Sequence, residues 1–156
     1  ITNNYPGTKR AGVATIVRKE AKGLNFEEIK INNEFKGRLI HIKLDNWNLF
    51  NVYVPAGSIS QSKIKFIMDI TNYIQKFKEP YIIGGDFNWV LKEEDKSEKM
   101  TDSDKDLSKW AKTFIQTNNL IDTFRWINNN TRKYTYTYQD NKGSRLDTLR
   151  FGESSS

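Results

Sequence analysis

The sequence predicts a single α/β domain in which mixed β-sheets pack face to face and helices cover the outside. Three features predict this fold class: short strands fill the first third of the chain, two amphipathic helices flank a buried strand, and further strands follow. The 156 residues fit one domain. We expect this domain to cover residues 1–151, and residues 152–156 to be a tail that is disordered or appended to the natural chain.

The N-terminal part has the pattern of an antiparallel meander. The expected strands are residues 12–17, 26–31, 38–44 and 47–54. In the third of them, Ile40, Ile42 and Leu44 share one face. A turn at residues 45–46 joins it to the fourth strand, which ends before Pro55.

A helix and a buried strand follow. Ser60 can cap the helix, which ends before Pro80. Its apolar face is expected to contain Ile64, Ile67, Met68, Ile74 and Phe77. The run Tyr81-Ile82-Ile83 lies between Pro80 and two glycines, which is typical of a buried central strand.

The C-terminal part repeats this alternation. Residues 92–106 are highly charged and lack apolar periodicity, so we expect an exposed loop. A second amphipathic helix carries Leu107, Trp110, Ala111, Phe114 and Ile115. A short turn at residues 120–124 and strands at residues 134–138 and 145–151 complete the domain.

Composition narrows the possible chemistry. The chain has no cysteine and one histidine, which excludes disulfides, thiolate metal sites and polyhistidine zinc sites within these residues. A bound metal would therefore have oxygen ligands, as magnesium, manganese and calcium prefer. No apolar run approaches the roughly 20 residues of a membrane-spanning helix. The net charge of +6 suits a nucleic-acid partner, although a lysine-rich composition alone would produce the same charge.

The most informative segment is Gly85-Asp86-Phe87-Asn88, which follows the buried strand. The glycines let the backbone turn, and the spacing places Asp86 and Asn88 on the same side. Asp86 can take a proton from water or bind a metal, and Asn88 can donate a hydrogen bond to a phosphate oxygen. The alternative is an Asp-Asn turn that only caps the strand end.

This segment belongs to an ordered series of motifs. The others are Gly12-Val13-Ala14, Gly37-Arg38-Leu39-Ile40, Asn51-Val52-Tyr53-Val54-Pro55, Asp122-Thr123-Phe124-Arg125, Tyr134-Thr135-Tyr136 and Ser144-Arg145-Leu146-Asp147. Over residues 11–148 the chain resembles the endonuclease/exonuclease/phosphatase superfamily, which includes apurinic endonucleases. The resemblance is greatest to the endonuclease domains of LINE-type (non-LTR) retrotransposons. It implies a four-layer, DNase I-like α/β sandwich of mixed sheets with flanking helices, incomplete at both ends.

The resemblance also implies catalytic roles. Asp86 would orient or deprotonate the attacking water and contribute to metal binding, while Asn88 would hold the scissile phosphate. Tyr53 would contact the same phosphate through its hydroxyl, or would be a half-buried strand tyrosine. Asp147 would orient a catalytic histidine, or would form a salt bridge with Arg145.

Substrate binding is assigned by resemblance to Tyr136, Arg145 and Asn51. Tyr136 would stack on a nucleic-acid strand, or would pack within its sheet. Arg145 would touch phosphates, or would be an ordinary surface charge. Asp95 matches an acidic position of the retrotransposon enzymes, but a solvated loop charge explains it equally well.

The chain also departs from the family. Relatives place an asparagine strand and a metal-binding glutamate before the Gly-Val-Ala strand, and a Ser-Asp-His motif near the C-terminus. Asn3 and Asn4 lie in a loop-like stretch and, like Glu20, are not credible substitutes, and His41 is expected to be a structural strand residue. Thr148 replaces the expected aromatic residue. We therefore expect this chain alone to bind Mg²⁺ or Mn²⁺ poorly and to cleave slowly or not at all.

The resemblance, together with the basic net charge, implies a DNA-nicking endonuclease domain of a retrotransposon polyprotein, which attacks phosphorus with water and leaves a 3′-hydroxyl. A reverse transcriptase would belong to the same polypeptide, and the protein would be intracellular, either nuclear or cytoplasmic. One alternative is a noncatalytic nucleic-acid-binding or scaffolding remnant, and another is an abasic-site repair endonuclease or other phosphoesterase. The chain would be an excised piece, a decayed element or a member completed by another polypeptide. No oligomeric state is predicted.

Overall fold

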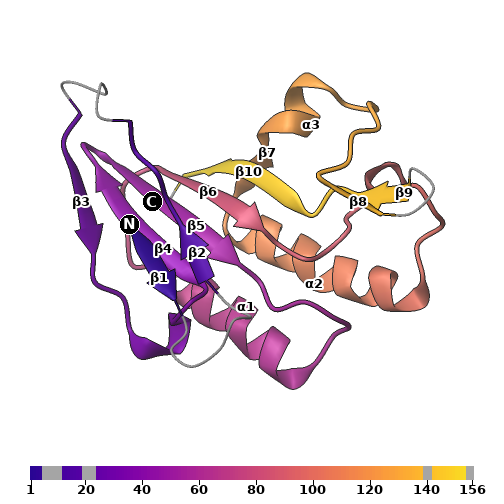
Figure 1. The fold of residues 1–156 in the computed structure, drawn as a ribbon, viewed down its shortest axis with the longest axis horizontal. Helices are drawn as coiled ribbons and strands as arrows, with labels where there is room; N and C mark the ends of the chain where they lie inside the picture. The colour runs from indigo at the N-terminus through magenta and orange to yellow at the C-terminus, as the bar shows by residue number, and fades with distance from the viewer. Residues whose placement is uncertain (5–11, 19–23, 139–141, 154–156) are drawn as a thin grey trace.

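A computed structural model describes residues 1–4, 12–18, 24–138 and 142–153, and its main feature is a six-stranded mixed sheet (Figure 1). In spatial order the strands are β3 (Phe26–Ile29), β4 (Leu39–Leu44), β5 (Trp47–Tyr53), β6 (Tyr81–Asp86), β10 (Asp147–Gly152) and β7 (Leu120–Asp122). β5 and β6 pair in parallel, whereas the other neighbours are antiparallel. The predicted meander is confirmed for β3, β4 and β5, but its expected first strand, residues 12–17, is wrong, because residues 12–14 pair outside this sheet. The predicted α/β fold class is confirmed.

The parallel pair depends on a helical crossover, because parallel strands cannot be joined by a tight turn. Helix α1 (Gln61–Ile74) provides it, and the Ser60 hydroxyl accepts a hydrogen bond from the Lys63 amide at 3.2 Å, as predicted for a cap. β6 lies between β5 and β10, so the predicted central strand is also confirmed. This β5-α1-β6 unit brings the carboxyl ends of two strands to one edge of the sheet.

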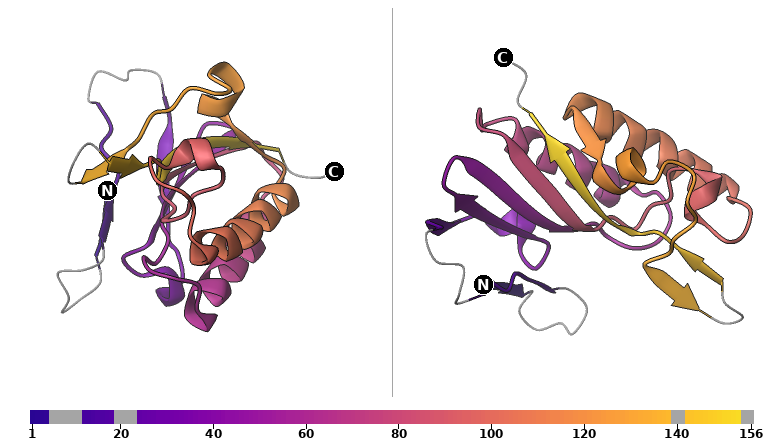
Figure 2. Two further views of the ribbon diagram at one scale, coloured as in Figure 1. Left: turned by 90° about the vertical axis from the view of Figure 1, so that its right-hand side faces the viewer. Right: turned by 90° about the horizontal axis from the view of Figure 1, so that it is seen from above.

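Helices α1 and α2 (Asp102–Thr117) cover one face of the sheet (Figure 2). They pack on Phe50, Val52 and Ile83 of the strands. The helical residues in this core include Phe66, Ile67, Ile70, Tyr73, Ile74, Leu107, Ala111 and Phe114. The predicted apolar face of α1 was partly wrong: Met68 is 53% exposed, because the buried stripe runs through Phe66 and Ile70 instead.

The opposite face carries a ribbon of two short strands, β1 (Thr2–Asn4) and β2 (Gly12–Ala14). The Asn3 amide nitrogen donates to the Leu39 carbonyl at 2.8 Å, and its oxygen accepts from the Gly37 amide at 2.8 Å. Asn3 and Asn4 therefore lie in a strand, which corrects the expected loop. Glu20 lies outside the described residues.

The charged segment before α2 is more ordered than predicted. Instead of an exposed loop, it contains the 3₁₀ turn η2 (Glu93–Asp95), where Asp95 is 2% exposed, and the start of α2 with a Thr101–Asp104 capping box. The remaining elements are η1 (Asn33–Phe35), α3 (Thr123–Ile127), β8 (Tyr136–Tyr138) and β9 (Lys142–Ser144).

The last predicted strand, residues 145–151, is confirmed as β10, which begins at Asp147 because residues 145–146 form the connection from β9. β10 also includes Gly152, which was assigned to the tail, because its pairing with β6 continues to Tyr81. Residues 154–156 of that tail lie outside the described part. Among the described helices, none combines the length and apolar character needed to cross a membrane.

Candidate active site

Three predicted catalytic side chains lie in one row at the carboxyl edge of β5 and β6. Tyr53 ends β5 and is the register partner of Asp86 at the end of β6, and Asp86 is the register partner of Asp147 at the start of β10. Asn88 follows two residues after Asp86. In open α/β sheets this edge is where ligands commonly bind. The fold thus brings together residues that are up to 94 positions apart, from Tyr53 to Asp147.

The turn that carries Asp86 requires a glycine before it. Gly85 has φ +132°, and a Cβ at this position would lie 2.0 Å from the Val52 carbonyl oxygen. After it, the Asn88 amide donates to Asp86 Oδ1 at 2.9 Å, and Asn88 adopts a left-handed φ of 48°. The turn predicted as the structural alternative is therefore present, and it fixes the Asp86 carboxylate.

Two further hydrogen bonds join this turn to the end of β5. The Asn88 side-chain nitrogen donates to the Val54 carbonyl at 2.8 Å, and the Val54 amide donates to the Asp86 carbonyl at 2.9 Å. This bond uses one of the two amide hydrogens of the Asn88 side chain, and the side chain also interacts with the Asp86 carboxylate. These bonds tie the Asp86–Asn88 turn to the residue that follows Tyr53.

The electrostatic environment makes Asp86 a better base than an ordinary aspartate. Burial raises its pKa, and the neighbouring charge of Asp147 raises it further, against the lowering effect of the hydrogen bond from Asn88. A carboxylate with a raised pKa accepts a proton from water more readily. Asp147 itself is exposed.

Arg38 holds Tyr53 at the edge of the sheet. Its guanidinium carbon lies 5.0 Å from the centre of the Tyr53 ring, and its Nη1 donates to the Tyr53 carbonyl at 3.3 Å. The Tyr53 amide donates to the Arg38 carbonyl at 2.8 Å. Gly37-Arg38 is part of one of the sequence motifs, but the sequence did not predict a role for Arg38.

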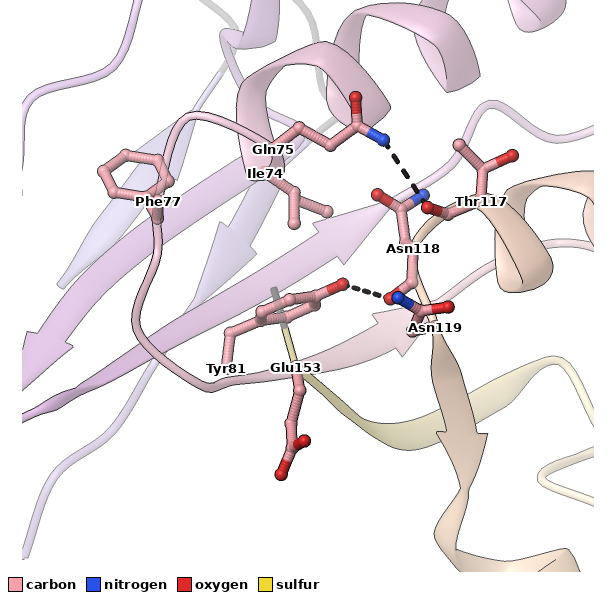
Figure 3. A pocket seen from close by; sticks show the side chains of 8 residues that line it. All are labelled: Ile74, Gln75, Phe77, Tyr81, Thr117, Asn118, Asn119 and Glu153. Atoms are coloured by element: carbon pink, nitrogen blue, oxygen red, sulfur yellow. Dashed lines mark hydrogen bonds between the residues drawn. The ribbon is translucent and has the colours of Figure 1, made fainter. Parts of the chain in front are cut away.

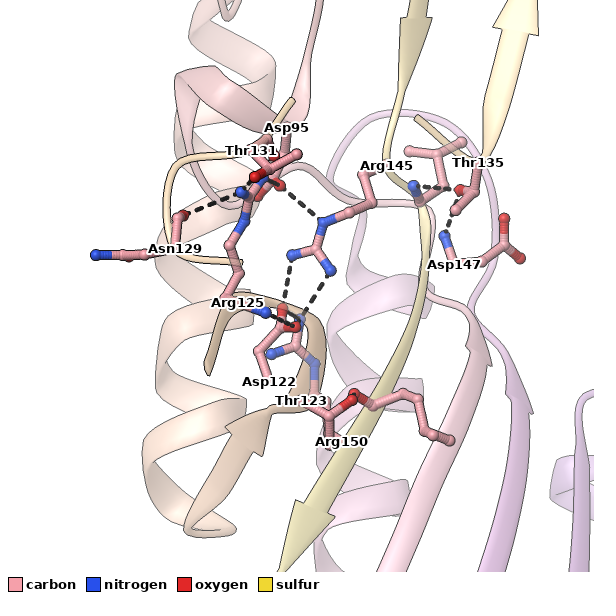
Figure 4. A network of polar contacts seen from close by, with 12 residues as sticks. Asp95, Asp122, Thr123, Arg125, Asn129, Thr131, Thr135, Arg145, Asp147 and Arg150 are labelled. Carbon is pink, nitrogen blue, oxygen red and sulfur yellow. Dashed lines mark hydrogen bonds and ion pairs between the residues drawn. The ribbon is translucent and has the colours of Figure 1, made fainter. Parts of the chain in front are cut away.

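The segment before β10 is fixed by Thr135. Its hydroxyl oxygen accepts the amides of Leu146 at 3.1 Å and Asp147 at 3.0 Å (Figure 4). The Leu146 carbonyl in turn accepts the Phe87 amide at 3.0 Å. Asp147 is therefore positioned by its backbone, next to the turn that carries Asp86.

Arg145, which precedes Leu146, belongs to a buried network of three arginines and two aspartates (Figure 4). Its Nε donates to Asp95 Oδ1 at 2.8 Å and its Nη2 to Asp122 Oδ2 at 2.6 Å. Arg125 also donates to Asp95, and Arg150 Nη2 lies 3.4 Å from Asp122 Oδ2.

The network changes three expectations. Arg145 is 5% exposed and its donors face carboxylates, so its side chain is not presented to a phosphate in this arrangement. The alternative salt bridge between Arg145 and Asp147 is wrong, because Arg145 pairs with Asp95 and Asp122. The solvated loop charge considered for Asp95 is wrong as well, since that carboxylate is buried.

The two other predicted substrate residues have different surroundings. The Asn51 side-chain nitrogen donates to the Ala14 carbonyl at 2.9 Å and to the Thr15 hydroxyl at 3.1 Å, so it holds the β1-β2 ribbon. Tyr136 is 55% exposed, and its ring centroid lies 5.8 Å from that of Tyr138. The packed interpretation of Tyr136 is therefore wrong, and the ring is available for stacking.

A buried lysine near the turn was missed by sequence reasoning. Lys63 is 1% exposed, and its ammonium donates to the carbonyls of Gly57 at 2.9 Å and Asn88 at 3.2 Å. Burial lowers its pKa to about 8, while the charge of Asp86 acts in the opposite direction. The sequence offers no signal for this burial, because Lys63 reads as an ordinary polar residue in the first turn of a helix.

The donor set fits a divalent ion only in part. Within the described ranges no group of three or more histidine, cysteine, aspartate or glutamate side chains could hold one. Asp86 and Asp147 provide neighbouring carboxylates, and Mg²⁺ would need water and substrate phosphate to complete its shell. His41 is buried and bonded to Tyr73 and Asn48, which confirms its structural role.

A pocket lies at the other end of β6. This pocket of about 170 Å³ is lined by Tyr81, at the start of the strand, and by Asn118 and Glu153 among others (Figure 3). The Tyr81 hydroxyl donates to the Asn118 carbonyl. Because Tyr81 and Asp86 are at opposite ends of β6, this pocket is separate from the candidate active site.

Solved structures share this architecture. The 3′ phosphatase NExo from Neisseria, bound to product DNA hairpin, aligns with a TM-score of 0.68, 16% identity, and coverage of 84% of this chain and 58% of that chain. An AP endonuclease from Archaeoglobus fulgidus aligns with a TM-score of 0.66 and 23% identity, over 83% of this chain and 58% of that chain. The AP endonuclease LMAP from Leishmania major aligns with a TM-score of 0.67 and 17% identity, over 84% of this chain and 54% of that chain. The chain has the fold of the endonuclease/exonuclease/phosphatase superfamily, so the predicted resemblance is confirmed for the fold.

The sequence is also similar to that of a transposon protein. The chain is 29% identical over 117 residues to the transposon TX1 uncharacterized 149 kDa protein of Xenopus laevis. The match covers 70% of this chain and 9% of that protein. No protein-family profile matches the chain.

Proposed function

We propose that this chain carries the base and the phosphate-binding side of a DNA phosphodiesterase site, of the kind used by nicking endonucleases. The observation that carries the proposal is the row of Tyr53, Asp86 and Asp147 at the carboxyl edge of the sheet, with Asn88 in the adjoining turn. The row combines a proton acceptor with two hydrogen-bond donors, which phosphodiester hydrolysis requires.

Each side chain has a distinct task in this reaction. Asp86 accepts a proton from water as the water oxygen bonds to phosphorus. Asn88 donates an amide hydrogen, and Tyr53 its hydroxyl hydrogen, to the phosphate oxygens. The P–O3′ bond then breaks, and the leaving oxygen takes a proton from solvent to become a 3′-hydroxyl. The Coulomb interaction with Asp147 raises the pKa of Asp86, which favours proton uptake by Asp86.

DNA is the substrate that the observations favour. The neighbours include a phosphatase bound to a DNA hairpin and AP endonucleases, and the sequence is similar to a transposon protein. The net charge of +6 agrees with a polyanionic partner. We extend the proposal to a retrotransposon origin, with a reverse transcriptase in the same polypeptide, and to abasic-site repair as the competing use of this site.

A divalent ion is part of the proposal. Mg²⁺ or Mn²⁺, held by Asp86 with water and substrate phosphates, would neutralise charge on the phosphate. Because the described donor set is small, we expect weak metal binding and slow cleavage by this chain alone.

The test is single-turnover nicking of supercoiled plasmid with excess protein and MgCl₂. We expect slow nicking that Asp86→Asn abolishes and Asp106→Asn leaves unchanged, because Asp106 is an exposed carboxylate on α2. Equal nicking by the wild type and Asp86→Asn would refute the role of Asp86. Faster cutting of an abasic duplex than of plasmid would favour repair over retrotransposition.

A noncatalytic DNA-binding protein is the second candidate. The observation that favours it is the net charge of +6, which suits DNA binding without requiring catalysis. Salt-sensitive DNA binding that survives Asp86→Asn, with no cleavage by either protein under any metal condition, would establish this candidate and reject the first.

A further inference from the structure

Lys63 places a positive charge beneath the turn that carries Asp86 and Asn88. It is the third residue of α1, and its side chain is 1% exposed. The ammonium donates to the Gly57 carbonyl at 2.9 Å and to the Asn88 carbonyl at 3.2 Å. It therefore connects the loop after β5 to the turn after β6, directly behind the proposed phosphate site.

This charge has no direct counterion in the described part of the chain. Both acceptors are neutral carbonyls, and no described carboxylate lies within 4.0 Å of the ammonium. By contrast, Lys65 on the same helix pairs with Asp69 at 2.6 Å. Burial of an ammonium without a counterion is unfavourable, and two neutral carbonyls offset only part of that cost. The fold therefore holds a positive charge here that a nearby anion would stabilise.

Asp86 offers only partial compensation. Its charge raises the pKa of Lys63, yet burial is the larger effect and lowers that pKa to about 8, so the group is still mainly protonated at pH 7. An anion arriving at Asn88 would supply the missing negative charge. A phosphate is such an anion, and the Asn88 side chain is one of its proposed donors.

We propose that Lys63 is a positioning residue whose buried charge attracts the phosphate group to the Asp86–Asn88 turn. In taking a DNA phosphate as the ligand, this inference rests on the proposed function. Lys63 acts through the turn and does not touch the substrate, because its ammonium faces the backbone carbonyls. The attraction is strong because a charge that water does not screen acts over several ångströms.

Three variants test the charge. Lys63→Gln keeps a hydrogen-bond donor and removes the charge, Lys63→Met removes both, and Lys65→Met is the matched control on the exposed face of α1. Binding of a fluorescent DNA duplex is measured by anisotropy over a range of salt concentrations, with circular dichroism to verify folding. We expect both Lys63 variants to bind on the order of tenfold more weakly, and Lys65→Met to stay within about twofold.

The outcomes separate the two proposals. If Lys63→Gln binds DNA like the wild type, the hydrogen bond matters and not the charge, and the inference is wrong while the proposed function stands. A second measurement follows the amide signal of Asn88 by NMR during titration with inorganic phosphate. If the wild type does not bind DNA, the proposed function fails. A phosphate-induced shift of Asn88 that Lys63→Met abolishes still supports the inference, and an equal shift in both proteins overturns it.

Discussion

Removal of the Asp95 carboxylate tests the buried arginine network. In Asp95→Ala, Arg125 loses its carboxylate partner, while Arg145 keeps Asp122. The side chains of Asp95, Arg125 and Arg145 are 2%, 9% and 4% exposed, so water can replace little of the lost interaction.

The magnitude follows from this burial. Loss of one partner from a buried ion pair costs about 3–5 kcal/mol, because the remaining charge stays uncompensated. We expect the lower end, about 3 kcal/mol, because Asp122 still holds Arg145. For a domain of this size such a loss lowers Tm by roughly 6–12 °C.

The assay is urea unfolding followed by fluorescence of the 4 tryptophans. Asp106→Ala is the control, because its pair with Lys109 is exposed to water and should contribute little to stability. A loss below about 1 kcal/mol in Asp95→Ala, equal to that of the control, would refute the claim that this network stabilises the fold.

Three further predictions concern the turn, the network at acid pH and the segment before β10. Gly85→Ala places a Cβ 2.0 Å from a carbonyl oxygen of β5 and should lower the free energy of unfolding by about 3 kcal/mol or more. The control Gly57→Ala, where a Cβ would have no atom within 4 Å, should lower it by about 1 kcal/mol. Thermal unfolding of the two variants measures the difference, and equal losses would contradict the clash. Burial opposes ionisation of Asp122, yet the arginines that bind its carboxylate lower its pKa below the ordinary value of 3.8 in the folded protein. The ionised carboxylate therefore contributes fully to stability above pH 3.8, and this contribution is lost as the pH falls through the pKa of the folded state. The difference in unfolding free energy between wild type and Asp122→Asn should therefore shrink below about pH 4, and a constant difference would contradict the linkage. Thr135→Val removes the acceptor of two backbone amides and should speed hydrogen exchange at residues 146–147. Thr113→Val on α2 is the control. Unchanged exchange in Thr135→Val would show that Thr135 does not hold this segment.

Local patterns predicted the elements that position the site. The buried strand that ends at Asp86, the Ser60 cap and the glycine turn were all visible in the sequence. Each depends on residues within a few positions of each other, so backbone preferences and short-range hydrogen bonds decide it. The same logic failed for Met68, because two helices and a twisted sheet together select which stripe of α1 is buried.

Charged residues were the least predictable part of the site. Asp95 stands in a run of charged residues and Lys63 in a polar helical turn, yet both are buried. Their partners lie elsewhere in the chain: Asp95 and Arg145 are 50 positions apart, and Lys63 and Asn88 are 25 apart. A sequence pattern reports the hydropathy of a segment, whereas the burial of a charge depends on which distant groups compensate it.

The sequence by itself determined the ordered series of motifs, the fold class and the turn that carries Asp86 and Asn88. Only the tertiary structure decided that Tyr53, Asp86 and Asp147 form one row, because that row follows from strand register across β5, β6 and β10. It also decided that Arg145 faces carboxylates and that Lys63 lies behind the turn. Register and burial are set by packing between distant segments, which the local preferences of a chain do not encode.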